Sequence, residues 1–352
     1  MKKFLWNILN ISYQPATFSK DPIKSILVIR MNRIGDMICT IPLLKTLRKE
    51  FQEASINLLA EETNAEVIRG ASYIDKIMVV KKNKAIFKNK LVNMVKILKD
   101  MDFDIAIGVK GGFSSNLAAA VFLSRAAYRI GYISESHHPL ELLYNLPIKK
   151  SKAVKHQVEQ CLDLLSPLGI PQERYIKDIS LEIPEKSSAR FRDFTASHNI
   201  KHREKLAVIN LSNDSEKKKW PVENFSGLIK KMNTDSINCI ITAAPPDFEK
   251  ARKLAEASRD NKSDTVFYET PHIMDFAAAS KAANILISHD SGAMHIGAAV
   301  NTKVMVIAGR GINPMVWGPY GEGHRCLLKP RIQDLTVDEV YREILWMLNE
   351  KN

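Results

Sequence analysis

The stretch Ile285-Leu-Ile-Ser-His-Asp-Ser-Gly-Ala-Met-His-Ile-Gly-Ala-Ala299 passes from a short apolar run through polar residues and a glycine into an alanine-rich segment. This order predicts a strand, a tight turn and a helix, whose polar residues at the turn are Asp290, Ser291, Gly292 and His295. Helix N-termini of α/β proteins bind phosphates, because they present unpaired N–H groups and the positive end of the helix dipole. Gly292 would let the backbone approach such a ligand closely. The pattern also fits an ordinary polar helix cap, so both interpretations stay open.

The composition of the chain predicts two globular domains. The 352 residues are 45% hydrophobic and 26% charged, which does not suit a fibre, a disordered chain or a bundle of membrane helices. Cys39, Cys161, Cys239 and Cys326 are far apart and form no CxxC pair, so neither a disulfide framework nor a structural zinc site is indicated. We expect buried free thiols and a reducing cytoplasm.

The charge of the chain predicts an anionic partner. The formal net charge is +12 and the isoelectric point is about 9.4, which suits nucleic acid, acidic lipid or a nucleotide sugar. Between Lys76 and Lys99 there are eight lysines and no acidic residue, with apolar residues at helical spacing. This basic amphipathic helix either packs on the protein with a solvated lysine face or meets anionic head groups or a phosphorylated acceptor.

The first residues, Met1–Ile11, form a basic and apolar stretch that is too short to span a bilayer. Asn7 and Asn10 interrupt it, and no clear small-residue cleavage site follows. A short helix here would either dock on the protein or lie on a membrane. No later segment approaches the ~20 apolar residues of a membrane-spanning helix.

Apolar runs alternate with helix-periodic segments along most of the chain. Such alternation is typical of βαβ units, and therefore of parallel sheets that are covered by helices on both faces. The expected strands fall into two series, which are 26–30, 56–60, 77–80, 104–109 and 128–132, then 206–211, 237–243, 265–268, 284–288 and 303–308. The sequence thus predicts an α/β fold of two Rossmann-like domains in tandem.

The two series set the expected domain limits. They are an N-terminal extension (1–22), a first Rossmann-like domain (23–183), a charged and polar linker (184–205), a second Rossmann-like domain (206–333) and a C-terminal helix (334–352). Thr336-Val-Asp-Glu339 is a capping box that marks the start of the last helix. The carboxyl ends of the strands in two such domains are expected to line a central cleft.

The loop after the first expected strand is a second candidate site, which reads Ile29-Arg-Met-Asn-Arg-Ile-Gly-Asp36. Gly35 supplies the turn, and Asp36 then lies near a helix N-terminus, where its carboxylate is favoured in the ionised form. An ionised carboxylate in a cleft can act as a general base. Asp36 could instead only cap the helix.

Five motifs, which include the two candidate sites above, follow one another along the chain. They are Ile26-Leu-Val-Ile-Arg with Arg33-Ile-Gly-Asp36, His156-Gln-Val-Glu with Leu168-Gly, Lys219-Trp-Pro with Phe225, Asp290-Ser-Gly-Ala-Met-His295, and Trp317-Gly-Pro-Tyr-Gly. Together they resemble the ADP-heptose:lipopolysaccharide heptosyltransferases, glycosyltransferase family 9, from about Ile26 to near the C-terminus. The resemblance implies a GT-B fold with the acceptor on the N-terminal side, the nucleotide sugar on the C-terminal side, inversion at the anomeric carbon, and no metal or other cofactor.

The resemblance also implies roles for single residues. Asp36 matches the general base that takes the proton of the acceptor hydroxyl, and Arg33 and Gly35 belong to the acceptor side. The residues expected on the donor side are Lys218, with Lys217 and Lys219 as alternatives, then Asp290, Ser291, Gly292 and His295, and also Asp247 or Glu249. Lysine and a helix terminus would neutralise the departing nucleoside diphosphate, as a metal ion does in other enzymes.

Two competing motifs carry less weight. Asp102-Phe-Asp104 has the DxD pattern of metal-dependent glycosyltransferases, but it leads directly into an apolar strand, which favours a role at the start of that strand. Gly309-Arg-Gly311 follows a strand, yet the third glycine of a dinucleotide-binding motif is absent and Pro314 soon follows. We therefore expect neither a metal site nor a nicotinamide cofactor.

Two segments depart from the family pattern. Asn210-Leu-Ser-Asn213 replaces the usual Pro-Gly turn, and Ala308-Gly-Arg-Gly-Ile312 replaces a Phe-Gly-Pro-Thr-like segment. Both flank the expected nucleotide site, so they leave the base and the sugar of the donor open.

These observations favour a cytoplasmic enzyme that transfers a sugar from a nucleotide diphosphate sugar, in the first place ADP-heptose. The acceptor would be an anionic glycolipid of the lipopolysaccharide core or a related surface glycan, reached by peripheral contact with the inner membrane, and no nucleic acid partner is expected. The alternatives are a GT-B enzyme for another nucleotide sugar, including an epimerase, and a non-catalytic protein that binds anions or membrane surfaces. Retention of both Asp36 and the Asp290–His295 motif argues against the non-catalytic alternative.

Overall fold

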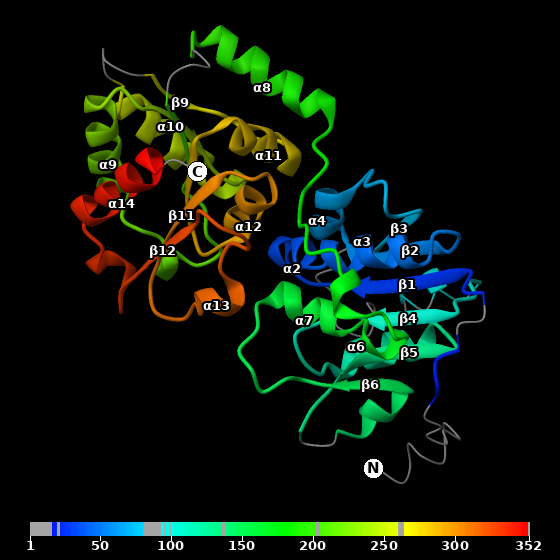
Figure 1. Cartoon of the computed structure of the whole chain (residues 1–352). Helices are drawn as coiled ribbons and strands as arrows, with labels where there is room; N and C mark the ends of the chain where they lie inside the picture. The colour runs from blue at the N-terminus through cyan, green and yellow to red at the C-terminus, as the bar shows by residue number, and fades with distance from the viewer. Residues whose placement is uncertain are drawn as a thin grey trace. The chain divides into compact units, whose positions relative to one another are not determined.

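The computed structural model describes residues 16–19, 22–80, 93–94, 96–98, 100–135, 138–200, 205–259 and 264–350. The chain divides into two units, Met1–Asp178 and Ile179–Asn352, and each contains one parallel sheet with helices against it (Figure 1). The expected N-terminal helix at Met1–Ile11 lies outside the described residues, as do residues 81–92 of the expected basic helix. Residues 93–94 and 96–98 are helical.

The first unit is built on a sheet of order β3-β2-β1-β4-β5-β6. In β1, at the centre, Ile26–Ile29 are completely buried, as expected for a parallel strand covered on both faces. The strands are β1 (Ser25–Arg30), β2 (Ser55–Glu61), β3 (Lys76–Val80), β4 (Ile105–Gly108), β5 (Tyr128–Ile133) and β6 (Leu146–Lys149). The helices are α2 (Ile34–Ile38), α3 (Ile41–Glu50), α4 (Glu62–Ala65), α6 (Ser115–Leu123) and α7 (Gln157–Asp163).

The second unit repeats this plan with a sheet of order β12-β11-β10-β7-β8-β9. The strands are β7 (Leu206–Asn210), β8 (Asn238–Thr242), β9 (Thr265–Phe267), β10 (Ile285–His289), β11 (Lys303–Ala308) and β12 (Arg325–Leu328). The helices are α8 (Glu185–Ser197), α9 (Val222–Thr234), α10 (Phe248–Ala257), α11 (Ile273–Ala282), α12 (Gly292–Ala299), α13 (Pro314–Trp317) and α14 (Val337–Asn349). Since β10 lies between β7 and β11, the loops at the carboxyl ends of these three strands are neighbours.

The predicted pair of parallel-sheet domains is confirmed, and each of the ten expected strands is present. The two strands that the sequence did not predict, β6 and β12, each lie at one end of a sheet, and the predicted strands β3 and β9 lie at the other ends. The two unpredicted strands are four residues long, and β6 contains Pro147, which cannot donate to a ladder of hydrogen bonds and is tolerated only at a sheet edge.

The expected linker, residues 184–205, contains a helix of the second unit. Helix α8 packs on α11, and its buried Phe191 makes an edge contact with the ring of Tyr268, which follows β9, at 5.4 Å between centroids. Arg190 of α8 also forms an ion pair with the buried Asp275 of α11. The exposed residues of α8 include Glu185, Lys186, Arg192 and Asp193, which explains why the composition alone suggested a connection.

The predicted capping box is present at the start of the C-terminal helix α14. Thr336 Oγ1 accepts a hydrogen bond from the backbone N–H of Glu339, and the Glu339 carboxylate accepts one from the backbone N–H of Thr336. Val340, Ile344 and Met347 of α14 are completely buried in the core of the second unit.

Asp104, the second acid of the DxD pattern, directly precedes β4, but its side chain serves the start of the neighbouring strand β1. Its Oδ2 atom accepts hydrogen bonds from the backbone N–H groups of Lys24 and Ser25, at 2.7 and 2.9 Å, where β1 begins. The four cysteines are free thiols, and all but the partly exposed Cys326 are buried. Among the described residues, no helix combines the length and the apolar character that crossing a membrane requires.

Candidate functional site

The predicted strand, turn and helix around Asp290 are present in the second unit. Strand β10 ends at His289, and α12 begins at Gly292. Ser291 is the N-cap residue of α12, and its Oγ accepts the backbone N–H of Ala293 at 3.3 Å. The cap interpretation is therefore correct for Ser291, and the other N–H groups of the first helical turn are the ones that could meet a ligand.

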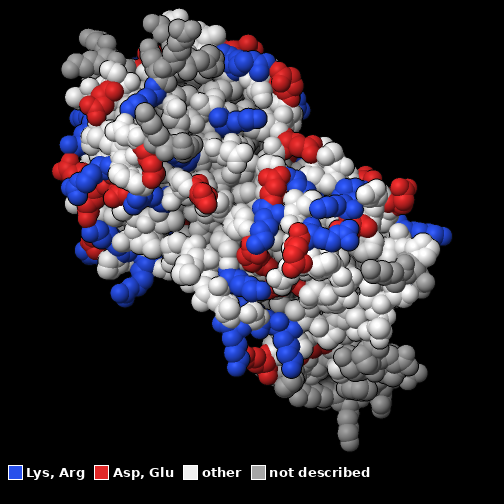
Figure 2. Space-filling model, viewed as in Figure 1, with Lys and Arg blue, Asp and Glu red and all other residues white. Residues whose placement is uncertain are grey.

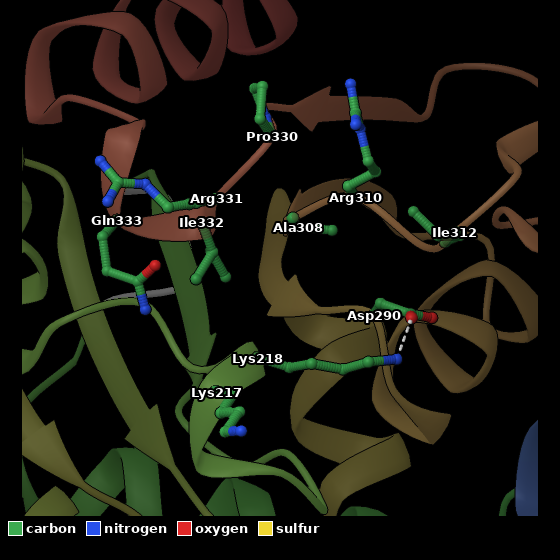
Figure 3. Close-up of a pocket in the computed structure, with 11 residues that line it drawn as sticks. Lys217, Lys218, Asp290, Ala308, Arg310, Ile312, Pro330, Arg331, Ile332 and Gln333 are labelled. Carbon is green, nitrogen blue, oxygen red and sulfur yellow. Dashed lines mark hydrogen bonds and ion pairs between the residues drawn. The ribbon is translucent and has the colours of Figure 1, made fainter.

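Lys218 lies beside Asp290. Its Nζ atom is 3.2 Å from Asp290 Oδ2, and the two side chains are 51% and 24% exposed. Figure 3 shows the two side chains pointing toward one another. An ion pair this open to solvent is weak, so a stronger anion such as a phosphate can replace Asp290 as the partner of Lys218.

A cavity of about 160 Å³ adjoins this ion pair (Figure 3). Its walls come from the ends of β7, β10, β11 and β12, through Lys217 and Lys218, Asp290, residues 308–310 with Ile312, and residues 330–333. Sites that enclose whole small-molecule ligands usually measure ~300–1,000 Å³. This cavity can therefore hold only a part of a nucleotide sugar. Ser291, Gly292 and His295 are not in its lining, and His295 is buried one helical turn into α12.

Lys219 forms ion pairs with two carboxylates of the protein itself. Its Nζ atom lies 2.6 Å from both Asp247 Oδ1 and Glu216 Oε1. Burial opposes the charge of Lys219, but the hydrogen bonds to Asp247 and Glu216 outweigh it and raise the pKa of the lysine. Asp247 is buried in this pair, whereas Glu249 is exposed and pairs with Lys253 on the surface of α10. The carboxylate partner of Lys218 is thus easier to replace than those of Lys219.

Trp220 anchors the segment that carries the lysines, a contribution that the sequence motif did not reveal. The indole Nε1 donates to the carbonyl oxygen of Leu335 at 2.9 Å, and the side chain is 2% exposed. The Trp220 ring meets Phe225 edge-on, with 5.0 Å between centroids. Pro221 follows directly and precedes α9, so the lysines stand immediately before a fixed point of the core.

The first departure from the family pattern forms its own turn. Asn210 Oδ1 accepts the backbone N–H of Ser212 at 3.2 Å, and Asn213 Oδ1 accepts that of Ser215 at 3.0 Å. These are hydrogen bonds of the kind by which Asn shapes a turn without glycine or proline. Asn213 also donates from Nδ2 to the carbonyl oxygen of Asp290 at 2.8 Å, which joins the loop after β7 to the turn after β10.

The second departure, residues 308–312, is a packed connection. A Cβ atom on Gly309 would come within 3.2 Å of the backbone nitrogen of Ile332, so this glycine allows two loops to pass closely. Gly311 has a φ of +124°, which only glycine adopts readily. The packing of the loop and its backbone conformation therefore account for glycine at both positions. No dinucleotide-binding motif is needed to explain them.

Asp36, the predicted base, lies in the first unit at the third residue of α2, next to the end of β1. Its Oδ1 atom is 2.5 Å from Nη2 of Arg30, a completely buried residue of β1. The remaining nitrogens of Arg30 donate to the carbonyl oxygens of Asp36 and Val109, at 3.1 and 2.7 Å. The sequence did not single out Arg30, although a charged residue at the end of an apolar strand was the available signal.

The second oxygen of Asp36 is much less engaged. Oδ2 accepts a 3.3 Å hydrogen bond from the backbone N–H of Arg33, the N-cap residue of α2, and the side chain is 12% exposed. Asp36 therefore does cap its helix, as the simpler interpretation held. Because Oδ1 is fixed by Arg30, Oδ2 is the atom that can accept a proton from a substrate. Gly35 is buried in the same turn.

The buried His289 is expected to make the free energy of unfolding depend on pH. Burial lowers its pKa to about 4, whereas an unfolded chain has ~6.5. Between these values the unfolded chain binds a proton that the folded chain does not. The free energy of unfolding is therefore expected to fall as the pH drops from ~6.5 to ~4, by about 3 kcal/mol from this residue, and no further below that.

Urea denaturation at pH 7, 5.5 and 4 measures this effect. The variant His289→Gln lacks the titrating group, so its stability should change less over this range than that of the unaltered chain. His324, whose pKa burial also lowers to about 4, supplies a second contribution that both proteins share. Equal pH dependence of the two proteins would contradict the assignment.

A family model and a curated relative both match this chain, and they indicate the same family. The model of "Glycosyltransferase family 9 (heptosyltransferase)" matches residues 91–343. Lipopolysaccharide heptosyltransferase 3 of Escherichia coli is 21% identical over 296 residues, which cover 81% of this chain and 83% of that protein.

Solved structures agree in fold. A glycosyltransferase of family 9 from Veillonella parvula superposes with a TM-score of 0.79 at 20% identity, covering 93% of this chain and 98% of that one. Heptosyltransferase WaaC of Escherichia coli, solved with ADP and with ADP-2-deoxy-2-fluoro heptose, superposes with a TM-score of 0.71 at 20% identity, covering 92% of this chain and 99% of that one. The fold is thus of the expected GT-B type.

Proposed function

Because the chain belongs to glycosyltransferase family 9, the heptosyltransferase family, we propose that it transfers a heptose or related sugar from ADP-heptose to a lipopolysaccharide-core or related surface glycan. The transfer inverts the anomeric carbon and uses no metal ion. Membership of this family also disfavours the epimerase and the non-catalytic alternatives.

The observation that carries the proposal is the open pair of Lys218 and Asp290 beside the N-terminus of α12. A nucleoside diphosphate leaves with additional negative charge, which has to be neutralised as the bond to the sugar breaks. Lys218 and the N-terminus of α12 supply positive charge at one place. Asp290, once displaced from the lysine by a phosphate, is free to accept hydrogen bonds from hydroxyl groups of the sugar.

Asp36 takes the other half of the reaction. In an inverting transfer, a base removes the proton of the acceptor hydroxyl as this oxygen attacks the sugar opposite its leaving group. Asp36 Oδ2 receives the proton, and Arg30 holds the carboxylate through Oδ1. The proton goes from the acceptor to the base, and the bonding electrons of the donor leave with the diphosphate.

The proposed acceptor is an anionic glycolipid. In the first unit the end of β6 and the loop after it expose Lys149, Lys150 and Lys152, and no acidic residue lies between them in the sequence. On the face drawn in Figure 2, lysine and arginine are mixed with acidic residues over both units. We place the enzyme at the cytoplasmic face of the inner membrane, where such an acceptor would be reached by peripheral contact.

A thermal-shift panel of ADP-, GDP-, UDP- and CDP-sugars tests the proposed donor. A ligand that binds only the folded chain raises its apparent stability, and ADP-heptose should raise the melting temperature most. Lys218→Ala should bind this donor about 10-fold more weakly, because it loses a charged hydrogen bond to phosphate. Lys253→Ala, an exposed lysine of α10, is the matched control and should bind normally. A response only to another nucleotide would contradict ADP-heptose, and unchanged affinity of Lys218→Ala would contradict the lysine.

Metal independence is tested by chelation. Lysine and a helix terminus replace the metal ion in this proposal, and Asp104 of the DxD pattern is already bonded to backbone N–H groups. Excess EDTA is therefore expected to leave the rate of sugar transfer unchanged. Loss of activity that a divalent ion restores would show that a metal takes part.

A further inference from the structure

The loop between β7 and α9, residues 211–221, is tied to the end of β10 at three points. The Trp220 backbone N–H donates to His289 Nε2 at 2.9 Å, Asn213 Nδ2 donates to the Asp290 carbonyl oxygen at 2.8 Å, and Lys218 Nζ lies 3.2 Å from Asp290 Oδ2. We name residues 211–221 the lysine loop. The first two contacts are more buried than the ion pair, so they can hold the loop when a ligand separates Lys218 from Asp290.

His289 is an unusual partner for a backbone amide. The ring is completely buried, and since Nε2 accepts a hydrogen bond, the proton of the neutral imidazole is on Nδ1. Burial lowers the pKa of His289 to about 4, which keeps the ring neutral at physiological pH. Nδ1 has no hydrogen bond of good geometry among the described residues, but the Ser212 backbone interacts with the ring and partly opposes the lowering of its pKa. The ring thus faces both ends of the lysine loop.

We propose that His289 is a positioning residue of the donor site, which fixes the lysine loop by accepting the Trp220 N–H and so keeps Lys218 beside Asp290. His289 acts through Lys218 and does not itself touch the substrate. The identity of the ligand rests on the proposed function, whereas the hydrogen bond does not.

The hydrogen bond can be separated from simple packing of the core. The Trp220 side chain is held independently, by Leu335 and by Phe225. Its backbone N–H, the amide directly after Lys219, is held by His289. Phenylalanine at position 289 would keep an aromatic ring against Phe225, whose centroid is 5.5 Å from that of His289, but would leave the N–H buried and unpaired. Glutamine offers a neutral acceptor of similar reach.

Calorimetric titration of the full chain with ADP therefore separates the variants. His289→Phe is expected to bind ADP about 10-fold more weakly than the unaltered chain, while His289→Gln stays within about twofold. Hydrogen exchange of residues 212–221, followed by mass spectrometry without ligand, should be faster in His289→Phe and near normal in His289→Gln. A purely structural role would lower the melting temperature of both variants without this difference.

Ile344→Ala is the matched control, because Ile344 is completely buried in the same core but belongs to α14. It should lower the melting temperature and leave both ADP affinity and exchange of residues 212–221 unchanged. Normal affinity and normal exchange in His289→Phe would overturn the inference, as would equal weakening of ADP binding in all three variants. If the unaltered chain binds no ADP, the proposed donor is wrong, and the exchange of residues 212–221 alone decides the role of His289.

Discussion

Replacing Asp36 with Asn is expected to slow sugar transfer by at least about 100-fold, while the affinity for the nucleotide sugar changes by no more than a few fold. General-base catalysis is worth ~100- to 10,000-fold, and the amide oxygen of Asn cannot take up a proton at neutral pH. The substitution keeps the shape of the side chain and its hydrogen-bond acceptor toward Arg30. The rate is measured as release of nucleoside diphosphate in the presence of acceptor, and the affinity by titration calorimetry.

A matched control separates the loss of the base from the loss of a charge. Asp178→Asn removes a more exposed carboxylate of the same unit, which pairs with Lys45 at 2.6 Å, and should leave the rate unchanged. A strong drop in donor affinity of Asp36→Asn would place Asp36 in donor binding instead. Normal turnover of Asp36→Asn would show that another group is the base.

The sequence could predict the fold because the central strands carry their own signal. Strands such as β1 and β10 are buried on both faces, so each appears as an uninterrupted apolar run followed by a polar turn. The terminal strands β6 and β12 are half-covered and short, and their four residues give no pattern that differs from a loop. These two strands are defined by their pairing with the neighbouring strands β5 and β11, and this pairing is not visible in the sequence pattern.

The candidate site could be predicted only in part, for the same physical reason. Asp36 and Asp290 follow strands and precede helices, and these local features are visible in the sequence. Contacts between distant segments are not visible in the sequence. These contacts decide which lysine has a replaceable partner. The burial of Lys219 against Asp247, 28 positions away, and the hydrogen bond from Trp220 to His289, 69 positions away, are of this kind.

Each unit has an ion pair beside the end of a central strand, and the two pairs differ in their exposure to solvent. In each, a carboxylate after a central strand pairs with a cation, but Arg30 is completely buried, whereas Lys218 is half exposed. A buried, hydrogen-bonded pair cannot exchange its partner without a large cost, while an open pair can. We therefore expect the Arg30–Asp36 pair to persist through the reaction and the Lys218–Asp290 pair to open when a diphosphate binds.

Replacing Arg30 with Met, which is apolar and also unbranched, should lower the free energy of unfolding by about 3 kcal/mol, because removal of one partner of a buried ion pair leaves the other uncompensated. The carbonyl oxygen of Val109 also loses its 2.7 Å hydrogen bond. Urea denaturation followed by circular dichroism measures the change. Sugar transfer should fall as well, since Asp36 Oδ1 is no longer held.

The double variant Arg30→Met with Asp36→Asn distinguishes the ion pair from packing. With the carboxylate removed as well, no uncompensated charge remains, so the double variant should recover part of the stability that Arg30→Met loses. Arg48→Met provides the control, because Arg48 pairs with Asp75 in the same unit while remaining partly exposed, and it should cost well under half as much. Equal losses in Arg30→Met and Arg48→Met would show that the buried pair has no special role. A double variant whose loss equals the sum of the two single losses would assign the effect to packing of the Arg30 side chain, and the orientation of the base by Arg30 would then have to be abandoned.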